Sequence, residues 1–313
     1  MKLAAIDIGS NGARLLISNV LKPSKALNNL EQAPQALQVV FKDVEYVRFA
    51  LRLGKDVFKK QRIGKKKQSQ LLKLMQSYKL LMELHEVDDY MALATSAFRE
   101  ASNGKEIALW IKQETGINIE IIEGVREAEI LNYVIIKQLD KNKNYLHIDV
   151  GGGSTEINLY RNKQKLISRS FPLGSIREVE DSMVAMQDMK TWIEKSRKRY
   201  FGEQEEIIAL GTGGNINKLQ NMLNKEDDTL LSQMDMVRAL EYLNNFSYDD
   251  MINVLELNPD RADTIIPAIK LYIAAMQYAK TDHIIVPKLG LKDGMMEVMY
   301  ARRKDTKKEL ILV

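Results

Sequence analysis

Two carboxylates flank a glycine turn in the segment YLHIDVGGGSTEINLY, residues 145–160. Asp149 stands where an apolar run ends, and Glu156 follows the three glycines at 151–153 by three residues. Glycines adopt backbone conformations with positive φ and let N–H groups approach a ligand closely. The turn therefore predicts a cradle for an anion beside two acids. For this segment taken alone, an ordinary tight hairpin with a polar tip is the alternative.

The same pattern occurs near the start of the chain. IDIGSNGARLLI (6–17) and IDVGGGSTEINL (148–159) both read Ile-Asp-apolar-Gly, followed by small or turn-forming residues and a second strand-like run. Two such hairpins, each heading an α/β half, indicate duplicated domains that face each other across a cleft. A phosphate chain held between two N–H-rich turns is the ligand that this arrangement predicts. For the matched pair we favour this interpretation over two unrelated hairpins.

A third glycine site lies in IIALGTGGNINKL, residues 207–219, which reads strand, glycine turn, helix. The free N–H groups and the dipole at the start of a helix make such a junction receptive to anions. Alone it is a weaker indication than the other two, because strand-glycine-helix turns are also common scaffolding.

Strands and helices alternate along the chain and must position these turns. Runs rich in Val, Ile, Leu and aromatic residues are typical of strands, and apolar residues at helical spacing are typical of helices. One helix is predicted from Asn103, a capping residue, to Gly116, a typical terminator. Further helices are predicted at 65–86 and 125–139, and strands at 2–8, 13–20, 44–53, 90–96, 117–124, 145–150, 154–160, 165–172, 206–211 and 282–287.

Length and composition agree with a globular protein of two domains. The chain has 313 residues, of which 45% are apolar and 28% charged, the balance of a protein with a proper core. No linker is rich in Pro or Gly, so the domain boundary must be short. We place it at Glu123–Gly124, which gives domains 1–123 and 124–313. The last helix of the second domain could pack against the first domain.

Several kinds of function are disfavoured by composition. The absence of cysteine excludes disulfides, thiolate metal ligands and thiol nucleophiles, and favours a cytoplasmic location. The start, MKLAAIDIGS, has too few consecutive apolar residues for a signal peptide. No segment approaches the ~20 apolar residues of a membrane span. The net charge of +4 gives no reason to expect nucleic acid. We therefore expect neither a membrane nor a nucleic acid as partner.

Basic residues cluster at 55–68, where seven of fourteen residues are Lys or Arg. Such a cluster can form a track for a polyanion. It can equally be the solvated start of a helix, which is the interpretation that we favour.

Eight segments spread over nearly the whole chain carry a likeness to known proteins: AAIDIGSNGARLLI, ALATSAFREASNG, IEIIEGVREAEIL, LHIDVGGGSTEINL, FPLGSIRE, ALGTGGNINKL, RADTIIPAI and GLKDGMM. In this order they resemble the exopolyphosphatase and guanosine pentaphosphate phosphatase family of the actin-like superfamily. The resemblance implies two actin-like (ribonuclease H-like) domains that face each other across a cleft. It also implies a phosphohydrolase that releases terminal orthophosphate from inorganic polyphosphate, and in some relatives from guanosine pentaphosphate. The chain resembles the short, two-domain form, for which a homodimer is a possible assembly.

The same resemblance implies Mg²⁺ as cofactor, with Asp149 and Glu156 as its ligands. Mg²⁺ prefers oxygen ligands and keeps several waters, so one or two carboxylates beside a phosphate cradle suffice. The implied phosphate-binding residues lie in three loops: Asp7, Gly9, Ser10 and Asn11; then Gly151, Gly152, Gly153, Ser154 and Thr155; then Gly211, Thr212, Gly213 and Gly214.

Activation of the attacking water needs a carboxylate that does not hold the metal, and the resemblance implies Glu127. Relatives read Glu-Glu-Ala-Arg where this chain reads Arg126-Glu127-Ala128-Glu129, which we interpret as a swapped ion pair around an unchanged base. Arg99 is the implied phosphate clamp, because its planar, permanently charged guanidinium suits phosphate oxygens. From the residues alone, Glu127 is also an ordinary acid in a first helical turn and Arg99 an ordinary surface arginine.

The chain departs from the family pattern in two loops. Gly12 replaces a serine, and GTGGN at 211–215 stands where relatives often have Gly-Thr-Ser-Gly-Thr. The third loop thus keeps its backbone N–H groups but lacks two hydroxyls.

Two other functions remain as alternatives. One is a phosphotransferase of the same superfamily, which would need an acceptor pocket. The other is a sensor that binds polyphosphate or an alarmone without turnover, against which the acids at 127, 149 and 156 argue. Phosphate release in the absence of an acceptor distinguishes the hydrolase from both.

Overall fold

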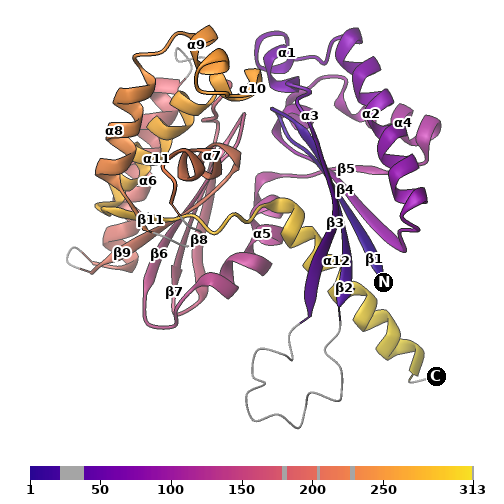
Figure 1. Ribbon diagram of the computed structural model, residues 1–313. Helices are drawn as coiled ribbons and strands as arrows, with labels where there is room; N and C mark the ends of the chain where they lie inside the picture. Colours follow the sequence, from indigo (N-terminus) through magenta and orange to yellow (C-terminus); the bar gives the residue numbers. More distant parts are fainter. Residues whose placement is uncertain (22–38, 178–181, 203–204, 226–229, 312–313) are drawn as a thin grey trace.

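The computed structural model describes residues 1–21, 39–177, 182–202, 205–225 and 230–311. Two β-sheets stand side by side, and each is covered by helices on both faces (Figure 1). In the described part of the chain, no helix is long and apolar enough to cross a membrane.

The first sheet has the strand order β3-β2-β1-β4-β5. Strands β1, β2 and β3 are antiparallel neighbours, whereas β4 and β5 run parallel to β1. Strand β1 is buried on both faces, which explains its almost continuous apolar sequence. The strands span Lys2–Ile8 (β1), Ala13–Leu21 (β2), Val40–Phe49 (β3), Asp89–Ala94 (β4) and Ile119–Ile121 (β5).

The second sheet has the order β10-β11-β9-β6-β7-β8 and repeats this plan. Strands β6, β7 and β8 form an antiparallel meander, and β9 runs parallel to β6. Strand β6 thus corresponds to β1, with a hairpin on one side and a parallel strand on the other. The strands span Asn144–Val150 (β6), Thr155–Arg161 (β7), Gln164–Phe171 (β8), Ile207–Thr212 (β9), Leu230–Ser232 (β10) and His283–Ile285 (β11).

Helices close the outer face of each sheet. The outer face of the first sheet is covered by α1 (Leu53–Lys60), α2 (Lys65–Leu84), α3 (Ser96–Glu100) and α4 (Gly104–Thr115). On the side of the second sheet lie α6 (Ser182–Tyr200), α7 (Gly214–Met222), α8 (Gln233–Leu243), α9 (Tyr248–Asn253), α10 (Pro259–Ala262) and α11 (Ile265–Ala279).

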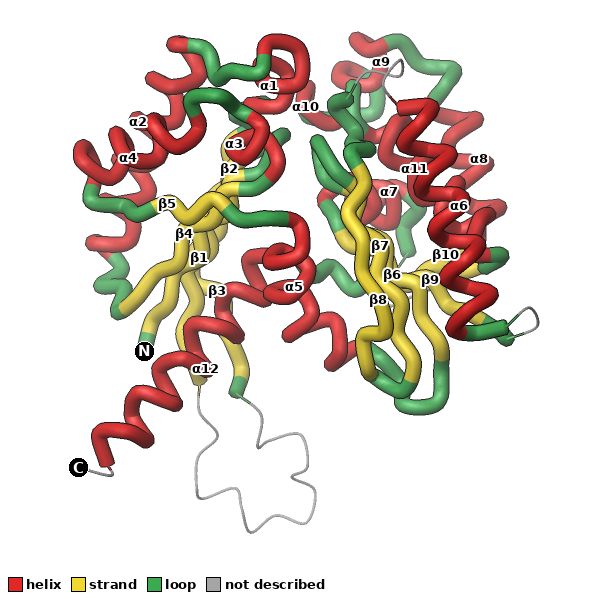
Figure 2. The backbone as a smooth tube through the Cα atoms, turned by 180° about the vertical axis from the view of Figure 1, so that it is seen from behind, coloured by secondary structure: helices red, strands yellow, loops and turns green. Residues whose placement is uncertain are grey.

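Helix α5 (Gly124–Gln138) lies between the sheets, and α12 (Leu291–Ile311) packs on α5 and on β1 and β4 of the first sheet (Figure 2). Helix α5 packs Leu131 and Val134 on the second sheet and Ile130 into the core beneath the first. The helices cross so closely that a Cβ on Gly294 would lie 2.3 Å from the carbonyl oxygen of Ile130. Because α5 contacts both halves, the domain boundary at Glu123–Gly124 stays a prediction.

Most element boundaries agree with the sequence patterns. Helix α4 starts after Asn103 and ends before Gly116, whose φ of 78° no side chain adopts easily. The strand predicted at 44–53 was wrong at both ends, since β3 covers 40–49. Arg52 takes a left-handed conformation with φ of 55°, so the chain leaves the sheet and enters α1 at Leu53.

Candidate active site between the two sheets

A cleft of about 410 Å³ opens between the two halves, where the turns after β1 and β6 face each other. Most of the residues implied by the family resemblance line it: Asp7, Gly9, Ser10, Asn11, Glu127, Asp149, Gly151, Gly152, Ser154, Glu156, Gly213 and Gly214. Five other residues implied by the resemblance are not part of the cleft lining among the described residues: Arg99, Gly153, Thr155, Gly211 and Thr212.

The two glycine turns have the same hydrogen-bonded geometry. The N–H of Gly9 donates to the carbonyl of Gly12 at 3.0 Å, and the N–H of Gly151 donates to that of Ser154 at 2.9 Å. The turns also touch across the cleft, since a Cβ on Gly152 would lie 3.0 Å from the Cβ of Ser10. The internal repeat in the sequence is thus a structural repeat.

Two carboxylates stand side by side at the end of the second sheet. Asp149 on β6 is directly opposite Glu156 on β7, and paired residues on neighbouring strands point to the same face. Glu156 accepts a hydrogen bond from the hydroxyl of Ser170 at 2.8 Å. Like charges directly opposite each other destabilise a sheet, so this pair is suited to share a cation.

Burial is the main cause that raises the pKa of each acid in this cluster. Burial raises the pKa of Asp149 to about 6. Burial and the neighbouring Asp149 raise the pKa of Glu156 to about 7. Burial, Glu156 and Asp149 hold the pKa of Glu127 well above its usual value. The surrounding protein therefore stabilises the ionised form of these acids poorly.

A hard divalent cation fits this arrangement. In the described part of the chain, no three acidic or histidine side chains form a ligand cage. Mg²⁺ needs no such cage, because it is usually held by one or two carboxylates together with waters and substrate phosphates. Asp149 and Glu156 are two neighbouring carboxylates in the cleft wall and would hold such an ion.

The uncompensated charge of Glu156 can be tested through the pH dependence of the protein's stability. Its pKa is raised from 4.5 to about 7, so the associated stability is present below pH 4.5 and is lost as the pH rises through 7. In EDTA at pH 8, Glu156→Gln should therefore increase the free energy of unfolding, by about 3 kcal/mol at most. Urea unfolding of variant and parent from pH 4.5 to 8 measures the difference, which should vanish at the acid end.

Mg²⁺ provides the control for that experiment. Bound cation should stabilise the parent, and the difference in the free energy of unfolding between Glu156→Gln and the parent should then become smaller. A Glu156→Gln variant that is less stable than the parent at pH 8 in EDTA would contradict an uncompensated carboxylate at this position.

Glu127 lies in the first turn of α5 and faces the carboxylate pair. It shares a helix face with Leu131 and Val134, which pack on the second sheet. Its Oε2 atom is enclosed, and no hydrogen-bond partner for it is present among the described residues. The electrostatic influence of Asp149 and Glu156 on its pKa places the three acids together. Glu127 also lines the cleft, so its carboxylate stands at the wall of the cleft.

The reversed charges around Glu127 form an ion pair on the outer side of α5. The Nη1 atom of Arg126 donates to Oε2 of Glu129 at 3.0 Å, and both side chains are well exposed. Neither residue lines the cleft among the described residues. The pair is thus a feature of the helix surface.

Arg126→Glu should therefore destabilise the helix only slightly, by a few tenths of a kcal/mol, because an exposed i,i+3 pair contributes little. The double change Arg126→Glu with Glu129→Arg should recover the loss. Thermal unfolding checks both variants. If Arg126→Glu removed phosphate release and the second change did not restore it, Arg126 would contact substrate.

Several implied phosphate ligands use their side chains within the protein. The hydroxyl of Ser10 hydrogen-bonds that of Ser96 at 2.7 Å, and the amide of Asn11 donates to the backbone carbonyl of Asp260 at 3.0 Å. The hydroxyl of Thr155 donates to the carbonyl of Leu173 at 2.7 Å. These three side chains therefore already have hydrogen-bond partners within the protein.

Asp7 lines the cleft and is paired with a cation. It is directly opposite Arg14 across β1 and β2, and Nη1 of Arg14 donates to its carboxylate at 2.6 Å. The acid thereby orients a guanidinium that lines the cleft.

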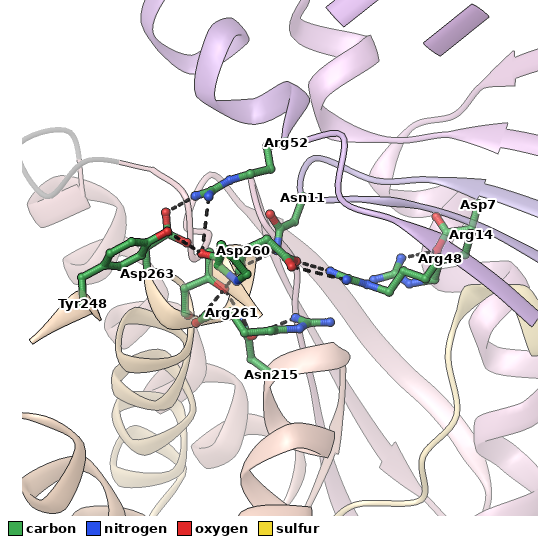
Figure 3. Close-up of polar contacts among 12 residues, drawn as sticks. Asp7, Asn11, Arg14, Arg48, Arg52, Asn215, Tyr248, Asp260, Arg261 and Asp263 are labelled. Atoms are coloured by element: carbon green, nitrogen blue, oxygen red, sulfur yellow. Dashed lines mark hydrogen bonds and ion pairs between the residues drawn. The ribbon is translucent and has the colours of Figure 1, made fainter. Parts of the chain in front are cut away.

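Cationic side chains from both halves also line the cleft, and the sequence patterns did not identify them: Arg14, Arg48, Lys218, Arg261, Lys288 and Lys292. Figure 3 shows three arginines of this group, with Arg48 bound to Asp260 and Arg261 bound to Asn215. Burial and the neighbouring arginines lower the pKa of Arg261 to about 10. Arginines that repel one another in a cleft favour an anionic ligand.

Arg99 belongs to α3 and contacts the segment that leads into α5. Its Nη1 atom donates to the carbonyl of Ile122 at 2.9 Å, and its Nε atom lies 3.6 Å from the carboxylate of Glu123. It lowers the pKa of Glu127 electrostatically. Its role as a phosphate clamp stays a prediction.

Two sheets of this topology around an anion-receptive cleft define a two-domain α/β protein of actin-like fold. The sequence model of the Ppx/GppA phosphatase family matches residues 30–302, and the chain belongs to this family. The family and the fold expected from the sequence are thereby confirmed.

Curated relatives share modest identity with the chain. The bifunctional 3-dehydroquinate synthase/phosphatase of Fusobacterium nucleatum is 27% identical over 305 residues, which cover 90% of this chain and 44% of that protein. Exopolyphosphatase 1 of Mycobacterium leprae is 22% identical over 178 residues, which cover 56% of this chain and 48% of that protein. The chain thus spans about half the length of the curated relatives it matches.

Solved structures show the same fold over almost their whole length. An exopolyphosphatase from Cytophaga hutchinsonii superposes with a TM-score of 0.76 at 23% identity, covering 96% of this chain and 97% of that one. The Aquifex aeolicus member of the Ppx/GppA family superposes with a TM-score of 0.71 at 20% identity, covering 97% and 98%.

Proposed function

We propose that the chain is a phosphohydrolase that releases terminal orthophosphate from inorganic polyphosphate by Mg²⁺-assisted attack of water. The observation that carries the proposal is the meeting of three carboxylates, at 127, 149 and 156, with two glycine turns and a set of arginines in one cleft. The names of the relatives, an exopolyphosphatase among them, agree with this activity. Guanosine pentaphosphate, which also ends in a phosphoanhydride, is a second candidate substrate.

The protein's own groups divide the work of the reaction. Asp149 and Glu156 would hold Mg²⁺, which would neutralise charge on the phosphate oxygens. The backbone of the two glycine turns would orient the terminal phosphate, and the cleft arginines would bind the phosphates behind it. Glu127 would accept a proton from the attacking water and hold its oxygen in line with the bond that breaks.

The proposal is tested by an assay of phosphate release with short polyphosphate, long polyphosphate and guanosine pentaphosphate, each with and without Mg²⁺. Mg²⁺-dependent release in the absence of any acceptor supports hydrolysis. Turnover that requires ADP or another acceptor would identify a phosphotransferase instead, and tight binding without turnover would identify a sensor. A cytoplasmic location and a homodimer belong to the same proposal, and cell fractionation and light scattering would test them.

A further inference from the structure

A row of polar side chains lies directly behind the carboxylate pair on the second sheet. In the sheet register, Asp149 is flanked by Glu156 on β7 and Thr212 on β9, and His147 is opposite Asn158. Residues two apart on a strand share a face, so His147 lies on the same face as Asp149, one step farther from the cleft. Fully buried polar groups at this depth are costly unless each finds a partner.

These side chains form a continuous hydrogen-bonded chain that ends on Asp149. Nδ1 of His147 lies 2.9 Å from Nδ2 of Asn158, and Nε2 of His147 lies 2.9 Å from Oγ1 of Thr212. Thr212 is directly opposite Asp149 on the neighbouring strand, and its hydroxyl lowers the pKa of that carboxyl as a hydrogen-bond partner. His147, Asn158 and Thr212 are each at most 1% exposed, so solvent does not compete for these bonds.

The direction of the chain follows from its last member. An ionised carboxylate only accepts hydrogen bonds, so the Thr212 hydroxyl must donate to Asp149. The Thr212 oxygen then accepts from His147, which places the single N–H of the neutral imidazole on Nε2. Nδ1 is left as an acceptor, and it faces the amide N–H₂ of Asn158. Every donor in this direction points toward the carboxylate.

We propose that His147 is a positioning residue for Asp149, which it holds through Thr212 in the orientation that a metal ligand needs. The inference rests on the proposed function, because it takes Asp149 as a ligand of Mg²⁺. Hydrogen bonds behind a ligand fix its orientation and raise its affinity for the metal. Glu156 has a comparable support in the hydroxyl of Ser170, but no described histidine stands behind it.

Two matched pairs of variants test the role with Mg²⁺ itself as the probe, titrated calorimetrically into the purified chain. Thr212→Val removes the hydroxyl at constant shape and Thr212→Ser keeps it. His147→Leu removes the N–H, and His147→Gln keeps an N–H near the position of Nε2. We expect the dissociation constant for Mg²⁺ to rise ~10–100-fold in the Val and Leu variants, and much less in the Ser and Gln variants.

The double variant His147→Leu with Thr212→Val should bind Mg²⁺ no more weakly than either single variant, because both changes break one chain. Equal affinity in parent, Val and Leu variants would overturn the positioning role while leaving the proposed function intact. Circular dichroism checks that each variant is folded.

A second measurement is independent of the metal. The ¹⁵N NMR shifts of the imidazole report which nitrogen carries the proton, and the spectrum of His147→Gln assigns the signal among the three histidines of the chain. We expect the Nε2–H tautomer in the metal-free parent. An Nδ1–H tautomer would overturn the inference, because Thr212 could then no longer accept from His147. A parent with the expected tautomer that binds no Mg²⁺ would overturn the metal assignment of the proposed function and the positioning role with it.

Discussion

Glu127→Gln should lower the rate of phosphate release by ~10²–10⁴-fold, the usual cost of losing a general base. Glutamine keeps the size and polarity of the side chain, but it cannot take a proton from water. The glycine turns and cleft arginines are untouched, so polyphosphate binding should remain close to that of the parent. Release assays at saturating substrate and calorimetric binding to the variant measure the two quantities separately.

Glu129→Gln is a matched control, because it makes the same change two residues along the same helix. Glu129 is exposed and paired with Arg126, so this variant should release phosphate at nearly the parent rate. If Glu127→Gln also released phosphate at a near-normal rate, the base would lie elsewhere. Glu123, at the start of α5, would be the next residue to test.

Asp149→Asn and Glu156→Gln should each raise the Mg²⁺ concentration that gives half the maximal rate. An amide keeps the shape of the carboxylate but loses the charge that makes an oxygen a good ligand for a hard cation. We expect a rise of at least ~10-fold, because even loss of an outer-shell partner costs 10–100-fold in metal affinity. Mg²⁺ titrations of the phosphate-release rate in both variants and the parent provide the measurement.

The same titration on Glu127→Gln separates the two roles. High Mg²⁺ should restore part of the rate to Asp149→Asn and Glu156→Gln, since mass action refills a weakened site. It should not restore Glu127→Gln, whose lost charge is assigned to the water. If Mg²⁺ rescued only Glu127→Gln and the other two were indifferent to it, the assignments of metal ligand and base would be inverted.

Local patterns in the sequence predicted the parts of the site that one short segment contains. The hairpin that carries Asp149 and Glu156, and its repeat around Asp7, could be read directly because spacing and glycines determine the turn. The helix of Glu127 was equally visible from its apolar periodicity. For these elements, the local preferences of the chain and the tertiary structure agree.

The cationic lining could not be read in this way, because its members come from distant segments. Arg48 belongs to β3 and Arg261 to α10, and only the packing of the two halves brings them into one cleft. Arg14 did carry a signal, as a charged residue in an otherwise apolar strand. Nor could the sequence reveal which acids are compensated, since that depends on the strand register. Asp7 looked equivalent to Asp149 until the register placed an arginine opposite it.

The two copies of the hairpin share one register and differ in the residue opposite the aspartate. In each copy the residue seven positions after the strand-end aspartate stands directly across from it, Arg14 in the first and Glu156 in the second. In the first copy the acid has an arginine as its direct partner. In the second copy an acid faces an acid, and the Mg²⁺ that we propose would supply the missing counterion. The residue at one equivalent position of the repeated hairpin thus sets the local charge of each half, while the hydrogen-bonded turn stays the same.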